Sequence, residues 1–200
     1  TGFQTCALPI LTAKSARDVI TLAKAQPGKV IFASSGAGTS SHLAMEMFRY
    51  MGGVELLHVP YKGGGPAVTA VMSGEVQGVF NVVTGTLPYV KSGKLRALAV
   101  SSAKRADIAP DIPTIAESGV PGYEVIAWYN VFAPARTPRP IIDKLNGEIN
   151  RLLQTEDVRN RFQTLGVAPL GGTPEALGKY LEFEIVRWAK LIKDTGVRLK

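Results

Sequence analysis

Short apolar runs alternate with amphipathic segments along the first half of the chain. Residues 30–33 form an all-apolar run, which is typical of a buried parallel strand. After them Leu43, Met47 and Met51 recur at helical spacing and predict an amphipathic helix. The same reasoning predicts strands over 54–59, 76–83 and 95–101, and helices over 15–26, 66–73 and 87–92. Strands that alternate with helices indicate an α/β domain with a parallel sheet covered on both faces.

The second half of the chain predicts helices without strands. Prolines interrupt the chain after residue 102, around one extended aromatic segment at 123–132. Helices are predicted over 137–153, over 156–165 and from 173 onward. The last helix carries an apolar stripe formed by Leu177, Leu181, Ile185, Trp188 and Ile192. Because these helices have no strand of their own to pack on, we expect them to need a sheet from elsewhere, with a boundary near residues 133–136.

The first residues of the chain predict no element. Residues 1–10 fit neither a helical nor a strand pattern, and no signal peptide is visible. We therefore interpret residues 1–11 as a non-native or truncated leader, and we expect a preceding half of the protein to be missing from this sequence.

Composition narrows the class of protein. Of 200 residues 46% are hydrophobic and 20% charged, as in an ordinary soluble globular protein. Lys and Arg number 23 against 16 for Asp and Glu, a formal net charge of +7 that permits an anionic partner. The basic residues are dispersed, without interleaved aromatics or a nucleic-acid-binding motif. We expect no nucleic acid as partner.

Cysteine and histidine restrict the possible chemistry. Cys6 is the only cysteine, so it forms no disulfide within the chain. His42 and His58 are the only histidines, and they show neither metal-ligand spacing nor an acid placed to orient them. A catalytic pair of His42 with Ser35 or Ser41 is conceivable, but the Gly-x-Ser-x-Gly pattern is absent. We predict no catalytic residue, no metal and no cofactor.

The segment between the first predicted strand and its helix is the main candidate for a binding site. Ligands of open α/β sheets bind at the carboxyl ends of strands, and a helix N-terminus offers unpaired N–H groups and a positive dipole end. Such a loop could hold a carboxylate, phosphate or sulfate; it could equally be a plain helix cap in a tight turn. Its candidate residues are Ser34, Ser35, Gly36, Gly38, Thr39, Ser40, Ser41 and His42.

Two further strand ends supply candidates. Tyr61, Lys62 and Gly63 follow one predicted strand, where Lys62 could supply charge or simply be solvated. Asn81 and Thr84 stand at the end of the next, where they could donate hydrogen bonds to a ligand or cap the following helix.

Motifs in a fixed order resemble one known family. Residues 34–44 (SSGAGTSSHLA), 58–63 (HVPYKG) and 93–100 (GKLRALAV) resemble the Bug family, the substrate-binding proteins of tripartite tricarboxylate transporters. The likeness continues through 111–117 (DIPTIAE), 119–123 (GVPGY), 132–134, 145–146, 165–167 and 171–175 (GGTPE). It covers about residues 12–200.

The resemblance implies a type II periplasmic-binding fold, in which two lobes close on a ligand. It implies that residues 12–133 form the second lobe and that residues 134–200 return to the first lobe, whose sheet is largely outside this sequence. Family members bind di- or tricarboxylates, acidic amino acids or aromatic carboxylates, gripping one carboxylate between two loops. The second of these loops matches residues 34–41 here.

The resemblance also implies a setting: a periplasmic monomer that passes its ligand to the membrane subunits of the transporter, or a periplasmic carboxylate sensor. One residue departs from the pattern, because Asn81 stands where many relatives carry an acidic residue. An aspartate there would suit an ammonium group, so Asn81 favours a ligand without an amino group.

Overall fold

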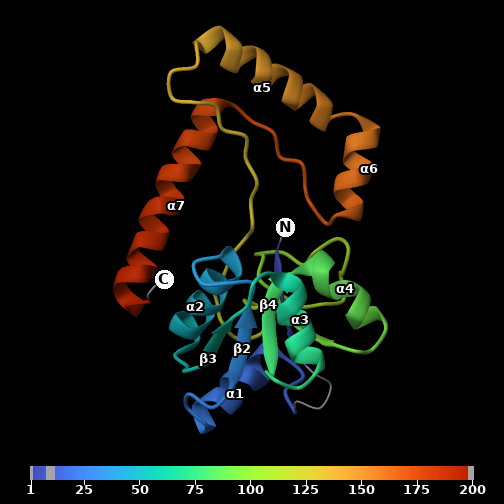
Figure 1. Cartoon of the computed structure of the whole chain (residues 1–200), viewed down its shortest axis with the longest axis vertical. Helices are drawn as coiled ribbons and strands as arrows, with labels where there is room; N and C mark the ends of the chain where they lie inside the picture. Colours follow the sequence, from blue (N-terminus) through green and yellow to red (C-terminus); the bar gives the residue numbers. More distant parts are fainter. Residues whose placement is uncertain (1, 8–11, 198–200) are drawn as a thin grey trace. The chain divides into compact units, whose positions relative to one another are not determined.

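The computed structural model describes residues 2–7 and 12–197. They fall into two compact units, Thr1–Ala127 together with Thr195–Lys200, and Trp128–Asp194. The division comes slightly before the boundary at residues 133–136 that the sequence analysis expected. Figure 1 labels the seven helices of the described residues and the strands β2, β3 and β4.

The first unit is built on a five-stranded sheet in the order β3-β2-β4-β1-β5. Its strands are β1 (Phe3–Ala7), β2 (Ile31–Ser34), β3 (Leu57–Pro60), β4 (Gly78–Val82) and β5 (Arg96–Val100). β2 pairs in parallel with β3 and β4, as the alternating pattern predicted. β1 pairs antiparallel with both β4 and β5. The sheet is therefore mixed: the expected parallel pairing holds for β2 with β3 and β4, whereas the antiparallel pairing of β1 was not expected.

Strand β1 corrects the reading of the first residues. The sequence analysis assigned no element to residues 1–10, whereas residues 3–7 form an interior strand of the sheet. Gln4, Thr5, Cys6 and Ala7 are all buried there. Residues 1 and 8–11 of the expected leader lie outside the described residues. The strand escaped notice because two of its buried side chains are polar, so its pattern has no apolar periodicity.

The two faces of the sheet have separate apolar clusters. On one face the rings of Phe32 and Phe48 both lie against Phe80, with centroid distances of 5.9 and 5.8 Å. Phe48 belongs to α2 (Ser40–Gly52), which therefore covers this face. On the other face α3 (Gly64–Met72) buries Ala67, Ala70 and other small side chains against Cys6, Ala33 and Val79. Alternation of side chains along each strand sends neighbours to these opposite faces.

Two more helices complete the first unit, and their boundaries can be compared with the predicted ones. α1 (Ala16–Ala25) begins after Ser15, whose hydroxyl caps the amide of Asp18 as the capping-box pattern predicted. α4 (Val83–Lys91) begins directly at the end of β4, earlier than the predicted start at residue 87. Pro88 lies inside the observed helix. The extended segment 123–132 makes only an isolated bridge, between Gly2 and Ile126.

The second unit is helical. It contains α5 (Arg139–Leu153), α6 (Glu156–Thr164) and α7 (Pro174–Thr195), close to the predicted boundaries. The side chain of Asn150 joins α5 to the turn before α7 by bonding both the amide and the carbonyl of Gly172, at 2.8 and 2.9 Å. No described residue of α5 or α6 is buried, and apolar side chains such as Ile141 and Leu145 are exposed. None of the described helices combines the length and apolarity that a bilayer span requires.

Candidate functional site

Three helices begin side by side at the end of the sheet where its parallel strands terminate. α2, α3 and α4 follow the carboxyl ends of β2, β3 and β4 in turn. The amide of Gly63 donates to the carbonyl of Ser35 at 3.0 Å, which joins the start of α3 to the loop before α2. The Asn81 amide donates to the carbonyl of Gly64 at 3.4 Å, which joins the end of β4 to the start of α3. The first amides of a helix have no partner within the helix. The carboxyl ends of β2, β3 and β4 therefore lie beside N–H groups without an intrahelical partner and beside positive helix-dipole ends.

The loop 34–41 takes a tight path that two glycines permit. Gly36 has φ 142° and Gly38 has φ 73°, values that side-chain-bearing residues rarely adopt. A Cβ atom on Gly36 would also lie 3.2 Å from the carbonyl oxygen of Tyr61, so the loop and the next strand end are in close contact. Thr39 caps α2 by accepting a hydrogen bond from the amide of His42, at 3.4 Å. The interpretation as a helix cap is therefore confirmed, and it is compatible with an anion site.

The hydroxyl groups of Ser35, Thr39 and Ser41 form a cluster at the mouth of the loop. Their oxygen atoms lie 2.7 Å (Ser35–Ser41), 3.0 Å (Thr39–Ser41) and 3.3 Å (Ser35–Thr39) apart. Thr39 donates its proton to the carbonyl of Gly36 at 2.7 Å. Ser41 can donate to Ser35, and the Ser35 hydroxyl itself donates to Oγ1 of Thr39 at 3.3 Å, which is longer than the usual distance between two hydroxyl oxygens. Ser35 is half-buried, Ser41 is buried and the side chain of Ser40 is exposed.

Two stacked imidazole rings lie beneath the loop. The rings of His42 and His58 are 4.0 Å apart between centroids and inclined by only 13°. The nitrogen Nδ1 of His42 accepts the amide proton of Gly38 at 3.0 Å, and Nε2 of His58 lies 2.7 Å from the hydroxyl of the fully buried Ser34. Burial, followed by the nearby charge of His42, lowers the pKa of His58 from 6.5 to about 4. His58 is therefore neutral at neutral pH.

An acidic residue orients His42, contrary to the sequence analysis. Glu46 lies one helical turn further along α2, with Oε1 at 3.5 Å from His42 Nε2. Arg49 binds both oxygens of the same carboxylate, at 2.7 and 2.9 Å. Burial raises the pKa of Glu46, but the hydrogen bonds from His42 and Arg49 outweigh it and the net shift is downward. The i, i+4 spacing of His42 and Glu46 on a predicted helix was the signal that could have revealed the contact.

The strand-end candidates divide into two groups. Asn81 is buried between two helix starts: a Cβ atom on Gly64 would lie 2.6 Å from its Oδ1, and one on Gly85 would lie 3.2 Å from its Nδ2. Thr84 is half-buried in the first turn of α4. The Tyr61 hydroxyl instead donates to Glu75 at 2.8 Å, beyond the far end of α3, and Lys62 is exposed. Among these side chains, the structure brings only Asn81 and Thr84 to the helix starts.

One buried residue near the site was missed because residues 1–11 were set aside. Gln4 on β1 is the cross-strand partner of Asn81. Its Oε1 accepts the hydroxyl proton of Thr86 at 2.6 Å, and its buried Nε2 has no hydrogen-bond partner in the described part of the chain. Gln4 and Asn81 therefore place two amide side chains together on the face of the sheet that α3 and α4 cover.

Comparisons with known proteins identify the family. Residues 5–197 match the sequence profile described as "Tripartite tricarboxylate transporter family receptor". The chain belongs to this family. A "UPF0065 protein in tcbD-tcbE intergenic region" of Pseudomonas sp. (strain P51) is 44% identical over 182 residues, which are 89% of this chain and 54% of that protein. The chain thus spans about half the length of this curated relative.

Solved structures of similar proteins share the fold of this chain. "R. palustris Rpa4515 with adipate" is 34% identical, with a TM-score of 0.88 over 98% of this chain and 65% of that one. "MatC (Rpa3494) from Rhodopseudomonas palustris with bound malate" is 29% identical, with a TM-score of 0.83 over 96% of this chain and 66% of that one. The periplasmic-binding fold expected from the sequence motifs is confirmed.

The geometry of this receptor-family chain does not support a serine hydrolase. Both ring nitrogens of His42 face other groups, Gly38 and Glu46. Ser34 is the serine that meets a histidine, but its side chain is fully buried and its oxygen also accepts the amide proton of Gly36 at 3.2 Å. A buried hydroxyl cannot attack a substrate that arrives from solvent. Among the described residues no three His, Cys, Asp or Glu side chains gather as a metal site would require.

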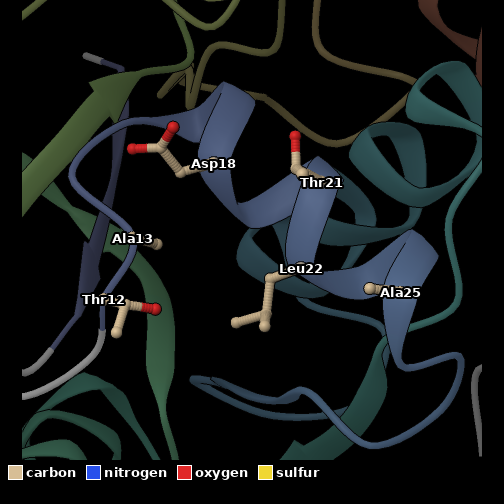
Figure 2. Close-up of a pocket in the computed structure, with 6 residues that line it drawn as sticks. All are labelled: Thr12, Ala13, Asp18, Thr21, Leu22 and Ala25. Carbon is tan, nitrogen blue, oxygen red and sulfur yellow. The ribbon is translucent and has the colours of Figure 1, made fainter.

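A separate hollow lies beside α1. It has a volume of about 300 Å³, and Figure 2 shows the six residues that line it: Thr12, Ala13, Asp18, Thr21, Leu22 and Ala25. None of them belongs to the loop 34–41 or to the strand ends beside it. Its one acidic group, Asp18, accepts the amide proton of Lys14 at 2.8 Å and serves the start of α1. The hollow therefore has a different chemistry from the loop.

Proposed function

We propose that this chain supplies the carboxylate-binding loop of a periplasmic solute-binding protein that serves a tripartite tricarboxylate transporter. The observation that carries the proposal is the loop 34–41, where a cluster of three hydroxyl groups lies at the N-terminus of α2. Amides and hydroxyls without an opposing charge suit an anion that must be released again. Membership of the receptor family supports the same reading.

The ligand we propose is a small di- or tricarboxylate or an aromatic acid, without an amino group. Asn81 is neutral and lies between the starts of α3 and α4, where the dipole ends favour negative charge. A ligand ammonium group would have no carboxylate partner at this residue. Adipate and malate, which are bound in two of the similar structures, both lack an amino group.

We further propose that the loop 34–41 forms one of two sides of the ligand site. The chain covers 65% of the adipate-bound structure and 54% of the Pseudomonas relative. On this proposal residues 12–133 belong to the second lobe, residues 134–200 belong to the first, and a loop outside this sequence grips the ligand from the opposite side. Delivery to membrane subunits of the transporter is part of the same proposal.

Substitution of the loop serine tests the proposal. In the complete protein that contains this chain, Ser35→Ala removes a hydroxyl that we expect to donate to the carboxylate in place of its long hydrogen bond to Thr39. A hydrogen bond to a charged group contributes about 1.5–3 kcal/mol, so we expect carboxylate affinity in a calorimetric titration to fall about tenfold or more. Ser92→Ala is the matched control, because Ser92 is exposed at the end of α4 and its hydroxyl bonds only to the carbonyl of Tyr89 among the described residues. Equal affinities of the two variants would show that the carboxylate does not bind at the loop 34–41.

A further inference from the structure

Two histidines hold the two glycine turns of the ligand loop. We propose that His42 and His58 are positioning residues, each of which fixes one end of the loop 34–41 through a single ring nitrogen. The inference rests on the proposed function of that loop. It concerns how the loop is shaped, since neither histidine has to touch the ligand.

His42 fixes the Gly38 end of the loop. Its Nδ1 accepts the amide proton of Gly38 at 3.0 Å, so Nδ1 must be unprotonated and the ring proton lies on Nε2. Nε2 faces the carboxylate of Glu46 at 3.5 Å, and Arg49 holds that carboxylate in place. This second partner favours one tautomer, because a proton on Nδ1 would point at the Gly38 amide.

His58 fixes the Gly36 end of the loop through Ser34. Its Nε2 lies 2.7 Å from the Ser34 hydroxyl, whose oxygen accepts the amide proton of Gly36 at 3.2 Å. Ser34 is fully buried, so no solvent molecule replaces this support. The two rings stack at 4.0 Å, which ties the supports together into one platform.

The platform matters because the two glycines of the loop could adopt other conformations. Gly36 and Gly38 adopt φ angles of 142° and 73°, and glycine populates many other conformations when it is not held. A loop that must be ordered on binding loses affinity in proportion to the conformations given up. Holding both glycines in advance keeps the Ser35, Thr39 and Ser41 hydroxyls in position for a carboxylate.

A crossed substitution tests the inference. An asparagine amide reaches the place of Nδ1 and a glutamine amide reaches the place of Nε2. At position 42, where Nδ1 is used, His42→Asn should keep affinity within about threefold and His42→Gln should lower it about tenfold, the value of one lost hydrogen bond. At position 58, where Nε2 is used, the order should reverse: His58→Gln should keep the affinity and His58→Asn should lower it. The probe is adipate, titrated into the complete protein, with malate as a second probe.

The reversed order separates positioning from simple packing. A packing role depends on side-chain size and would favour the same substitute at both positions. Helix propensity cannot produce the expected loss at position 42, because glutamine is favoured in the first turn of a helix. An identical order at both positions, or no difference, while the wild-type protein still binds a carboxylate, would overturn the inference and leave the proposed function intact.

A spectroscopic measurement tests the inference without ligand. Nitrogen-15 spectra of the imidazoles in the complete wild-type protein at neutral pH should show His42 with a bare, hydrogen-bonded Nδ1 and a protonated Nε2. The Gly38 amide resonance should keep its position in His42→Asn and move in His42→Gln. The opposite His42 tautomer in the wild-type protein would contradict the inference, even if none of the variants folds.

Discussion

Asn81 places a neutral amide beside the proposed ligand site. Its side chain is buried at the carboxyl end of β4, and its amide contacts the first residue of α3. The sequence identified this position as a departure from the family pattern, and the structure places it between two helix starts. What the sequence could not show is its cross-strand neighbour Gln4, because the pairing of β1 with β4 joins residues that are distant in the chain.

The first prediction concerns ligand choice at this position. Asn81→Asp adds a negative charge, so we expect malate to bind about tenfold more weakly while aspartate, which carries an ammonium in place of the hydroxyl, loses less or gains. Calorimetric titrations of the complete protein with both ligands measure the ratio of affinities. Asn81→Ala is the control that removes the amide without adding charge. If Asn81→Asp changes the affinity for malate and the affinity for aspartate by the same factor, no ligand amino group lies near this side chain.

A second residue-scale prediction follows from the low pKa of His58. Burial lowers this pKa from 6.5 to about 4, so between these pH values the unfolded chain binds more protons than the folded protein. The free energy of unfolding should therefore fall as the pH falls from 6.5 to about 4, by at most about 3 kcal/mol at 1.36 kcal/mol per unit, and by less because solvent screens this half-buried ring.

Urea titrations of the wild-type protein and His58→Gln at a series of pH values measure this contribution. Glutamine does not titrate, so the stability of the wild-type protein relative to His58→Gln should fall as the pH falls through the window. A difference that stays constant between pH 6.5 and 4 would show that the His58 ring is not held neutral in the folded protein.

Individual partners in the site were the part that sequence could not predict. The loop 34–41 was recognised from its position after a strand, and Thr39 does cap α2. The contacts of His58 with Ser34 and of Tyr61 with Glu75 depend on where the strands lie in the sheet. Only Glu46 was within reach of sequence reasoning, through its helical spacing from His42.

At the scale of elements, the apolar pattern was most reliable where buried side chains are apolar. β2 lies within one residue of its predicted range, and its buried Phe32 and Ala33 are apolar. α2 forms where the helical spacing predicted a helix, but its buried side also includes His42 and Glu46, and Met51 is exposed. β1 was missed because Gln4 and Thr5 are buried despite being polar. Burial of such groups depends on partners elsewhere in the chain, here Thr86 on α4 for Gln4, and local pattern carries no information about them.

The pairing of β2 with β4 supports a stability prediction. Phe32 and Gly78 are paired in this ladder, and a Cβ atom on Gly78 would lie 2.4 Å from the Phe32 ring. Because Phe32 is fully buried against Phe80, its ring has little room to move. Gly78→Ala should therefore lower the free energy of unfolding by about 1–3 kcal/mol.

Chemical denaturation measures the effect, and Gly65→Ala is the matched control. A Cβ atom on Gly65 would meet nothing within 4 Å, and this residue lies in the first turn of α3. Alanine is a better helix former than glycine, so the control should be neutral or stabilising. A Gly78→Ala protein as stable as the control would show that Phe32 does not pack over β4 as described.

At the scale of the whole molecule, the two halves of the chain differ in how they bury apolar surface. The first unit has a sheet with an apolar cluster on each face, whereas α5 and α6 of the second unit bury none of their described side chains. The sequence predicted these helices without a strand of their own. On the proposal that they belong to another lobe, we expect their partner sheet in the part of the relatives that this chain does not cover.

The central claim is that the complete protein binds a small carboxylate through the loop 34–41. The most direct measurement is the stability of the complete protein with a panel of carboxylates that includes adipate, malate, citrate and benzoate. A ligand at 100 times its dissociation constant should raise the free energy of unfolding by about 2.7 kcal/mol, and one class of carboxylate should do so. No stabilisation by any member of such a panel would contradict the account.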